Sequence, residues 1–357
     1  MSLLDNTLVS IKPLDVKAMD EAQKALDYLL KPQGSLGRLE DIARQVAGIT
    51  GKVKNTLDKK AILVMASDNG VTDEGIAASP RDFSMLVTDT MLRGISGVCT
   101  LARHAGAEVF VVDLGLEKDP PTEGLIKRKI RRMTSNFAKE PAMTRAEAIQ
   151  AIEIGIEETT KLIQSGYNII GTGEMGIGNT TTSSAMLHVF SGEPLDVVVG
   201  RGAGLDDNAF QHKKEVIRDA VALHKPNAAD PLDVLLKVGG FDIAAMAGTY
   251  LACAAHRVPV LIDGFISGVA AVLAMRICPV ARDFMLASHS SAEPGAQVVM
   301  RELNLEPYLN MGMRLGEGTG CAVAFHLIDA SMFMMNYQGT FADIGVPPAI
   351  SNLENNK

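Results

Sequence analysis

Two glutamates are set among glycines, where a bare backbone would let a ligand come close to a carboxylate. Glu317 lies in MRLGEGTGCAVAF (residues 313–325) with a glycine on either side, and Glu174 lies in GTGEMG (residues 171–176). An apolar run follows Glu317, so this acid fits equally well at the start of a helix, where its charge would meet the helix dipole. The residues alone leave both interpretations open.

The glycine-rich segment YNIIGTGEMGIGNTTT (residues 167–182) follows an apolar run and fits two kinds of anion-binding loop. Its glycines at 171, 173 and 176 have the G-x-G-x-x-G spacing of dinucleotide-binding loops. That interpretation also requires an acid at the end of the next strand to hold a ribose hydroxyl. Asp196 precedes the next apolar run instead of ending it, so the pattern gives an NAD-binding oxidoreductase little support.

The second interpretation of this segment is a cradle for one phosphate group. Gly176, Asn179 and Thr180 would open a helix, and the backbone N–H groups at a helix start attract anions. Gly202 in GRGAG would supply further amides, and Lys213 would supply a cation. Glycines at these places could also serve only to make tight turns. Their recurrence after several apolar runs favours ligand binding.

The composition excludes several classes of protein. The chain of 357 residues is 47% hydrophobic and has a net charge of −8 without a long basic run, so we expect no nucleic-acid partner. Its four cysteines are scattered, which indicates neither a zinc site nor a disulfide framework. His289, in ASHSSAEPG, is expected to be a structural hydrogen-bonding residue rather than a metal ligand. No signal peptide and no apolar run of about 18 residues is found, so we expect no membrane span and a cytoplasmic location.

Apolar runs that end in polar, glycine-containing turns recur along the chain and predict strands. The runs fall at residues 61–67, 107–115, 167–182, 258–265 and 283–291, with 196–204 as a sixth. Helical stretches lie between them. This alternation predicts an α/β fold, in which a parallel sheet is flanked by helices in a Rossmann-like three-layer arrangement. Ligands in such folds bind beyond the carboxyl ends of the strands, where the polar and glycine clusters fall.

The two ends of the chain look mainly helical. Residues 1–60 and 300–357 are therefore expected to pack together as a smaller helical domain. Residues 61–299 would form a large α/β domain that carries the ligand sites.

Four separated blocks give the chain a specific resemblance to a known family. They are KPQGSLGRLE (31–40), GTGEMGIGNTTTSSA (171–185), KVGGFDIAAMAG (237–248) and MRLGEGTGCA (313–322). Together they resemble the nicotinate-nucleotide–dimethylbenzimidazole phosphoribosyltransferase family of cobamide assembly. The similarity runs nearly end to end, from about residue 10 to 345.

The resemblance implies a reaction and its partners. Nicotinate mononucleotide would give up its phosphoribosyl group to an aromatic acceptor, the lower ligand of a cobamide, and nicotinate would leave. An α-riboside phosphate would form. No metal or redox cofactor would be required, because the glycosidic bond to a pyridinium nitrogen is already polarised. The family fold is a parallel sheet with flanking helices plus a small helical domain, usually as a dimer.

The resemblance also implies roles for individual residues. Glu317 would be the general base that takes the acceptor's proton, and Glu174 would lie near the ribose and help to stabilise or orient it. The residues expected around the phosphate and ribose are Gly176, Asn179, Thr180, Gly202, Lys213, Gly264, Phe265 and Ser291, with Asp263 lining the same cavity. Those expected beside the acceptor are Ser79, Val87, Met175 and Leu315.

Two positions depart from the family pattern on the acceptor side. Asn69 stands where much of the family has a histidine, and Val87 stands where we align a glutamine of benzimidazole-using members. One branch of the family activates phenol or p-cresol and works as a heterodimer of two paralogous chains. Benzimidazole and phenolic acceptors therefore both stay open, as do a homodimer and a heterodimer. An inactive paralogue that only completes a partner's site is disfavoured by the presence of both Glu174 and Glu317.

Overall fold

Six parallel strands form a single sheet in the order β3-β2-β1-β4-β5-β6 in the computed structural model, which describes residues 2–202 and 204–346. The strands are β1 (Lys60–Ser67), β2 (Ala107–Gly115), β3 (Ile126–Lys127), β4 (Ile169–Met175), β5 (Val260–Ile262) and β6 (Met285–Ala287). The parallel sheet and its flanking helices confirm the predicted α/β class. Five of the strands fall within the apolar runs that predicted them.

The sixth predicted strand is wrong. Residues 196–202 include most of the short helix α8 (Leu195–Val198) and a turn, and Val198 and Val199 are buried. A valine run favours a strand by propensity, but propensity yields to packing, and here α8 packs between α7 and α9. The actual sixth strand, β3, is two residues long and lies in a charged stretch that has no strand pattern.

Helices occupy most of the remaining described chain. The α-helices are α1 (Leu3–Ser10), α2 (Val16–Tyr28), α3 (Arg38–Thr50), α4 (Asp82–Leu92), α5 (Gly97–His104), α6 (Arg145–Gln164), α7 (Asn179–Ser191), α8 (Leu195–Val198), α9 (Asp207–His224), α10 (Pro231–Val238), α11 (Phe241–His256), α12 (Phe265–Ile277), α13 (Ala296–Leu303) and α14 (Thr319–Tyr337). Short 3₁₀ helices are η1 (Gly70–Glu74), η2 (Pro279–Phe284) and η3 (Phe341–Ile344). No helix within the described ranges has both the length and the apolarity that crossing a bilayer demands.

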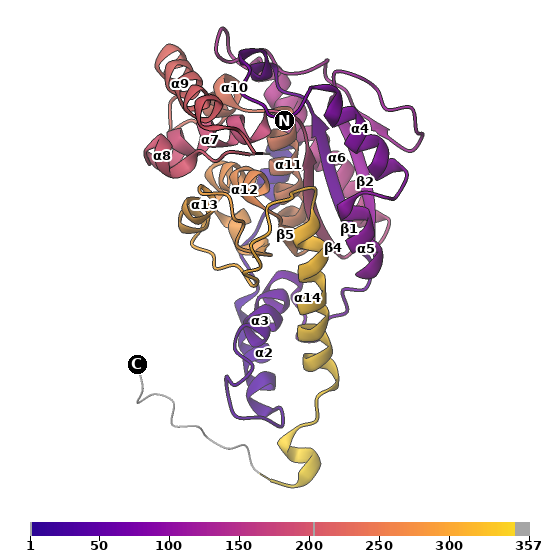
Figure 1. Cartoon of the computed structure of the whole chain (residues 1–357). Helices are drawn as coiled ribbons and strands as arrows, with labels where there is room; N and C mark the ends of the chain where they lie inside the picture. The colour runs from indigo at the N-terminus through magenta and orange to yellow at the C-terminus, as the bar shows by residue number, and fades with distance from the viewer. Residues whose placement is uncertain (1, 203, 347–357) are drawn as a thin grey trace.

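The sheet separates two hydrophobic cores, as the alternation of side chains along a strand requires. Leu63 and Met65 of β1 pack into the core that includes α6, α11 and α12. Ile62 and Val64, which point the other way, pack into the core that includes α3, α5 and α14. Helices therefore cover both faces of the sheet (Figure 1).

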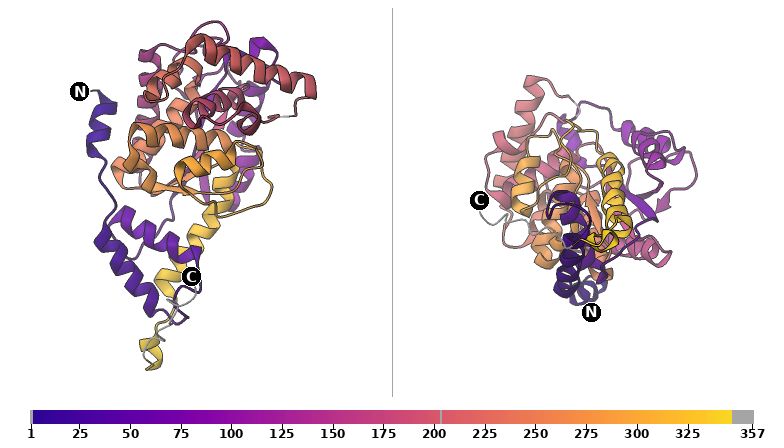
Figure 2. Two further views of the ribbon diagram at one scale, coloured as in Figure 1. Left: turned by 90° about the vertical axis from the view of Figure 1, so that its left-hand side faces the viewer. Right: turned by 90° about the horizontal axis from the view of Figure 1, so that it is seen from below.

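Helices α2, α3 and α14 form a group at one end of the sheet, and α14 also contacts the sheet at β4 and β5. Helix α2 packs on α3, and α3 packs on α14, so that the three lie beside one another below the sheet (Figures 1 and 2). Helix α1 instead packs on α6 and α11, and Leu4 and Ile11 belong to the core on that side. We propose that α2, α3 and α14 form the centre of the smaller helical domain. Its predicted extent stays a prediction, and residues 347–357 lie outside the described residues.

Helices α6 and α11 approach each other through glycines. A β-carbon on Gly155 would stand 1.9 Å from the carbonyl oxygen of Ala245, and one on Gly248 would stand 2.0 Å from that of Ile152. Both contacts are with rigid backbone, so any side chain at either place would force the two buried helices apart.

We predict that Gly155→Ala lowers the free energy of unfolding by about 1–3 kcal/mol, because the added methyl overpacks this crossing. Urea denaturation measures the change. Gly339→Ala is the matched control, since its β-carbon would stand an ordinary 3.7 Å from Oδ2 of Asp343. Equal midpoints for the two variants would contradict the role given to the crossing.

Candidate active site

One cavity of about 530 Å³ opens at the carboxyl edge of the sheet. Its wall comes from the ends of β4 and β5, the segment after β6, the starts of α7 and α12, and the turn before α14. The loop before α4 and α4 itself close the other side. Parallel strands bring their carboxyl ends to one edge, which is why segments far apart in the sequence meet here.

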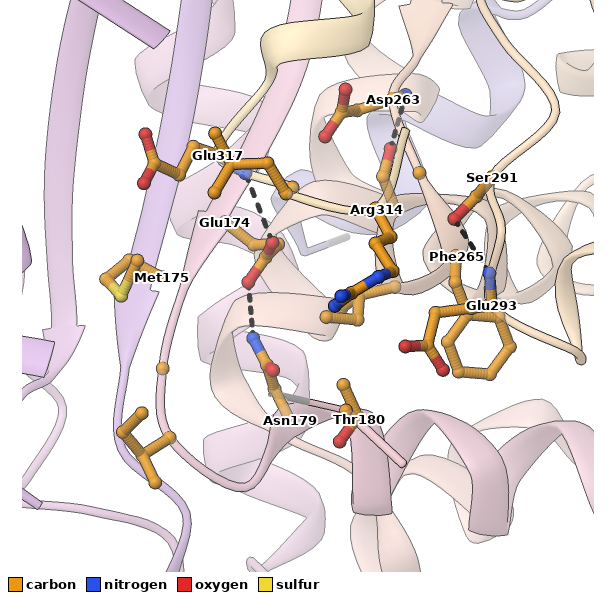
Figure 3. A pocket seen from close by; sticks show the side chains of 18 of the residues that line it. Glu174, Met175, Asn179, Thr180, Asp263, Phe265, Ser291, Glu293, Arg314 and Glu317 are labelled. Atoms are coloured by element: carbon orange, nitrogen blue, oxygen red, sulfur yellow. Dashed lines mark hydrogen bonds between the residues drawn. The ribbon is translucent and has the colours of Figure 1, made fainter. Parts of the chain in front are cut away.

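All of the predicted site residues except Lys213 line this cavity. They are Glu317, Glu174, Gly176, Asn179, Thr180, Gly202, Asp263, Gly264, Phe265, Ser291, Ser79, Val87, Met175 and Leu315. Glu317 and Met175 lie toward one end and Ser291 and Phe265 toward the other, with Glu174 and Asn179 between them (Figure 3).

The turn that carries Glu317 has an unusual backbone. Gly316, Glu317 and Gly318 have φ angles of +80°, +64° and +101°, and a left-handed non-glycine residue costs roughly 1–3 kcal/mol. Gly173 makes room for this turn, since a β-carbon there would stand 2.4 Å from the carbonyl oxygen of Glu317. A β-carbon on Gly316 would stand 2.4 Å from Oε1 of Glu174. The glycines thus bring the two glutamates together.

The Glu317 carboxylate does not cap α14. Its Oε2 accepts a hydrogen bond of 3.1 Å from the Val98 N–H at the start of α5. Its Oε1 has no hydrogen-bond partner among residues 2–202 and 204–346, and the side chain lies on the cavity wall with 8% of the residue exposed. Burial raises the pKa of Glu317, the charge of Asp263 raises it further, and the Val98 amide lowers it.

Glu174 is held from both sides at the end of β4. Its Oε1 accepts the Glu317 N–H at 3.4 Å, and its Oε2 accepts from Nδ2 of Asn179. The same Nδ2 donates to Oδ2 of Asp242 at 3.1 Å, so that one amide bridges two buried carboxyl groups (Figure 3 draws its bond to Glu174). Burial and the charge of Asp242 raise the pKa of Glu174 to about 8.

Asp263 fixes the start of α14. Its carboxylate accepts the N–H groups of Gly318 at 3.0 Å and Gly320 at 2.6 Å. Burial raises the pKa of Asp263, while the charge of His289 and these amides lower it. Helices α7 and α12 also follow a glycine N-cap, Gly178 and Gly264, but no side-chain cap holds their first amides. In α7 the amides of Asn179, Thr181 and Thr182 already bond to backbone carbonyls, so the Thr180 amide and the first amides of α12 are the ones available to an anion in the cavity.

Lys213 stands behind the cavity wall. Its buried Nζ donates to Oγ1 of Thr180 at 2.9 Å and to the carbonyl of Gly200 at 3.1 Å. Burial lowers the pKa of Lys213 to about 8, and the charge of Glu293 opposes this shift. Thr180 therefore lies between the Lys213 ammonium group and the cavity, and the ammonium group is close enough to favour an anion bound there.

Three comparisons with known proteins bear on this geometry. A family model described as phosphoribosyltransferase matches residues 11–346. The chain belongs to this family. It is 49% identical to a nicotinate-nucleotide–dimethylbenzimidazole phosphoribosyltransferase of Clostridium acetobutylicum, over 97% of this chain and 98% of that one. It is 51% identical to the protein of the same name from Acetivibrio thermocellus, over 96% and 97%.

The fold agrees with solved structures of relatives. The crystal structure of CobT from Thermus thermophilus matches with a TM-score of 0.89 and 36% identity, over 93% of this chain and 100% of that chain. The protein is therefore an enzyme of the phosphoribosyltransferase class, as the four sequence blocks predict.

Several site residues of this phosphoribosyltransferase were not predicted, and three of them carry ionisable groups that bear on its electrostatics. Arg314 and Glu293 line the cavity, and Asp242 lies behind Asn179. Burial raises the pKa of Glu293, and the charges of Lys213 and Arg314 lower it. The sequence holds a signal for Asp242, which is an acid at the start of the otherwise apolar stretch FDIAAMAG.

The G-x-G-x-x-G spacing has a packing role in this enzyme. Gly171 and Gly173 lie inside β4 and not in the turn that follows it. A β-carbon on Gly171 would stand 2.7 Å from Cβ of Cys321, and that on Gly173 would meet the Glu317 carbonyl. These glycines admit the start of α14, whereas a dinucleotide loop needs its glycines in the turn.

We predict that the stability of Glu174→Gln relative to the wild type rises with pH, while its activity is lower. Glu174 has a raised pKa, so the folded state holds its proton from the ordinary value near 4.5 up to about 8, and stability falls as pH rises through that range. Glutamine has no charge to bury, so its advantage should grow with pH, reaching on the order of 1–2 kcal/mol above about pH 8. Thermal unfolding at several pH values measures this. A difference that shrinks as pH rises would contradict the assigned pKa.

Proposed function

We propose that this chain transfers the phosphoribosyl group of nicotinate mononucleotide to 5,6-dimethylbenzimidazole or a related aromatic acceptor. The observation that carries the proposal is that Glu317 and the turn at residues 176–180 face one cavity. A carboxylate for the acceptor's proton and open amides for the sugar phosphate are then available side by side. The names of the relatives from Clostridium acetobutylicum and Acetivibrio thermocellus support the choice of donor and acceptor.

The phosphate of the donor would bind between the starts of α7 and α12. The first amides of α12 and the Thr180 amide of α7 have no hydrogen-bond partner among the described residues, and Ser291 and Thr180 line the same end of the cavity. Lys213 adds a positive charge behind Thr180. Helix dipoles, hydroxyl groups and one cation together suit a phosphate group.

The acceptor would lie at the opposite end, against Glu317. Val87, Met175 and Leu315 are apolar, and the flat backbone of the glycine-flanked turn lets a ring approach the carboxylate. As the acceptor atom bonds to C1′, the acceptor loses a proton to Oε1 of Glu317, and the electron pair of the broken bond stays with nicotinate. Attack on the face opposite nicotinate inverts β to α. Holding both reactants in one cavity removes much of the entropic cost.

Glu174 would stabilise the sugar during transfer. Positive charge develops on the ribose as the bond to nicotinate breaks. That charge favours the ionised form of Glu174, and a preorganised anion beside the ribose lowers the barrier. Glu174 cannot drift, because Asn179 and the Glu317 amide hold one oxygen each.

A phenolic acceptor is the second candidate, and Val87 favours it. A glutamine here could bond to the second nitrogen of a benzimidazole, whereas valine offers no hydrogen bond. The dimeric state and the cytoplasmic location stay predictions.

We predict that Glu317→Gln lowers kcat by about 10²–10⁴ while the fold persists, because the amide cannot accept the acceptor's proton. Acceptor-dependent nicotinate release and thermal unfolding measure both quantities. Glu140→Gln, on the surface, is the control and should keep the full rate. Full activity in the Glu317 variant would refute the base assignment.

We predict that Val87→Gln raises the kcat/KM ratio of dimethylbenzimidazole to p-cresol by about three- to tenfold, as one added hydrogen bond would. Products are identified by mass after each acceptor is supplied separately. Leu86→Gln is the control, since its neighbour Val87 lines the cavity and Leu86 does not. The prediction fails if both variants shift the ratio equally.

A further inference from the structure

Two buried oxygens behind the active site border the same small space, and neither has a hydrogen-bond partner within the described part of the chain. Asn69 and Asp242 are both 0% exposed, and Oδ1 of each has no hydrogen-bond partner within the described part of the chain. Both oxygens lie close to the point where a β-carbon on Gly240 would stand, Asp242 at 2.5 Å and Asn69 at 2.8 Å. They therefore share one small space, which Gly240 leaves open.

The amide of Asn69 is fixed in this orientation by its other end. Its Nδ2 donates to the carbonyl of Ile177 at 3.3 Å and lies 3.5 Å from that of Ser67. Turning the amide over would place its oxygen against two carbonyl oxygens. Oδ1 therefore faces Asp242, and an ionised Asp242 would set acceptor against acceptor in a buried space, which is costly.

We propose that Asp242 is a positioning residue that carries a proton in the working enzyme, with its Oδ1–H donating to Asn69 Oδ1. One proton satisfies both oxygens, and Oδ2 still accepts from Asn179. The inference rests on the proposed function only for its effect on catalysis. The hydrogen-bond chain then runs Asn69, Asp242, Asn179, Glu174 and ends at the Glu317 amide.

The charges around Asp242 agree with a neutral carboxyl group. Burial raises the pKa of Asp242 to about 7, against the lowering by Asn179 and by the amides at the start of α11, and the charge of Asp68 after β1 raises it further. Glu174 faces it across Asn179 from β4. The nearby cation Arg131 lies over the ring of Phe241 and contributes no hydrogen bond to Asp242.

A neutral Asp242 has a consequence for Glu174. The charge of Asp242 is one of the causes that raise the pKa of Glu174, so a proton on Asp242 removes it. Glu174 then ionises more readily at neutral pH. A proton on Asp242 therefore weakens the hold of Glu174 on its own proton, which favours an anion on the cavity wall, beside the ribose, where positive charge develops.

Infrared difference spectroscopy tests the proton directly, without substrate. Glu174 also holds a proton at about pH 6, so the test is the difference between two spectra. The wild type minus Asp242→Asn should contain a deuteration-sensitive C=O band of a neutral carboxylic acid, and the wild type minus the control Asp219→Asn, on the exposed face of α9, should not. The absence of that band from the Asp242→Asn difference spectrum would overturn the proposal. If Asp242→Asn does not fold, Asn69→Leu provides a second test. It removes the oxygen that accepts the Asp242 proton, so the frequency of the C=O band should change. An unchanged frequency would also overturn the proposal.

Kinetics test the positioning role separately. Asparagine at 242 can donate to Asn69 and accept from Asn179 at every pH. We therefore expect Asp242→Asn to keep kcat within about threefold at neutral pH and to lack the alkaline fall in kcat that we expect of the wild type. Asp242→Ala should lower kcat by about tenfold to a hundredfold with little change in KM, because Glu174 is misplaced. Equal losses in the two variants would mean that an ionised carboxylate is required. If the wild type transfers no phosphoribosyl group, the proposed function fails while the infrared result still decides the proton.

Discussion

The active site depends on how the amino end of α14 is seated on the edge of the sheet. Asp263, at the end of β5, accepts the N–H groups of Gly318 and Gly320, and Gly171 and Gly173 leave room on β4 for the approach. This contact sets the left-handed turn that presents Glu317 and brings its amide to Glu174. Each oxygen of Asp263 accepts one of these two hydrogen bonds. The carboxylate therefore holds the start of α14 in place as well as lining the cavity.

Buried acids dominate the chemistry of the site, and a small number of donors decide which of them can be charged. Glu174, Asp242, Asp263 and Glu317 all have raised pKa values because burial disfavours their anions. Asn179, Val98 and the first amides of α14 supply the donors that hold these acids in place. Such a site costs stability in the free enzyme, which is expected where preorganised charge serves a transition state.

Pattern and resemblance predicted different parts of this molecule. Apolar runs ending in glycine and acid located five strands and the edge where the ligands bind, because that pattern follows from strand burial and turn geometry. The run at 196–204 gave a wrong strand prediction. The strand propensity of valine does not show whether a neighbouring strand is available for pairing. The roles of Glu317 and Glu174 came from the resemblance, since a glycine-flanked acid has two local explanations. Asp242 escaped notice because its partners, Asn69 and Asn179, are distant in sequence, and only the fold brings them together.

Helix α14 runs from the turn that carries Glu317 to the α2–α3 pair without a loop between them. Its 19 residues span about 28 Å at 1.5 Å per residue, and α3 packs along it. A continuous α-helix of this length has no flexible joint between its two ends. The α2–α3 pair is therefore connected to the Glu317 turn by one unbroken helix, whose amino end is anchored to the sheet by the two amides that Asp263 holds.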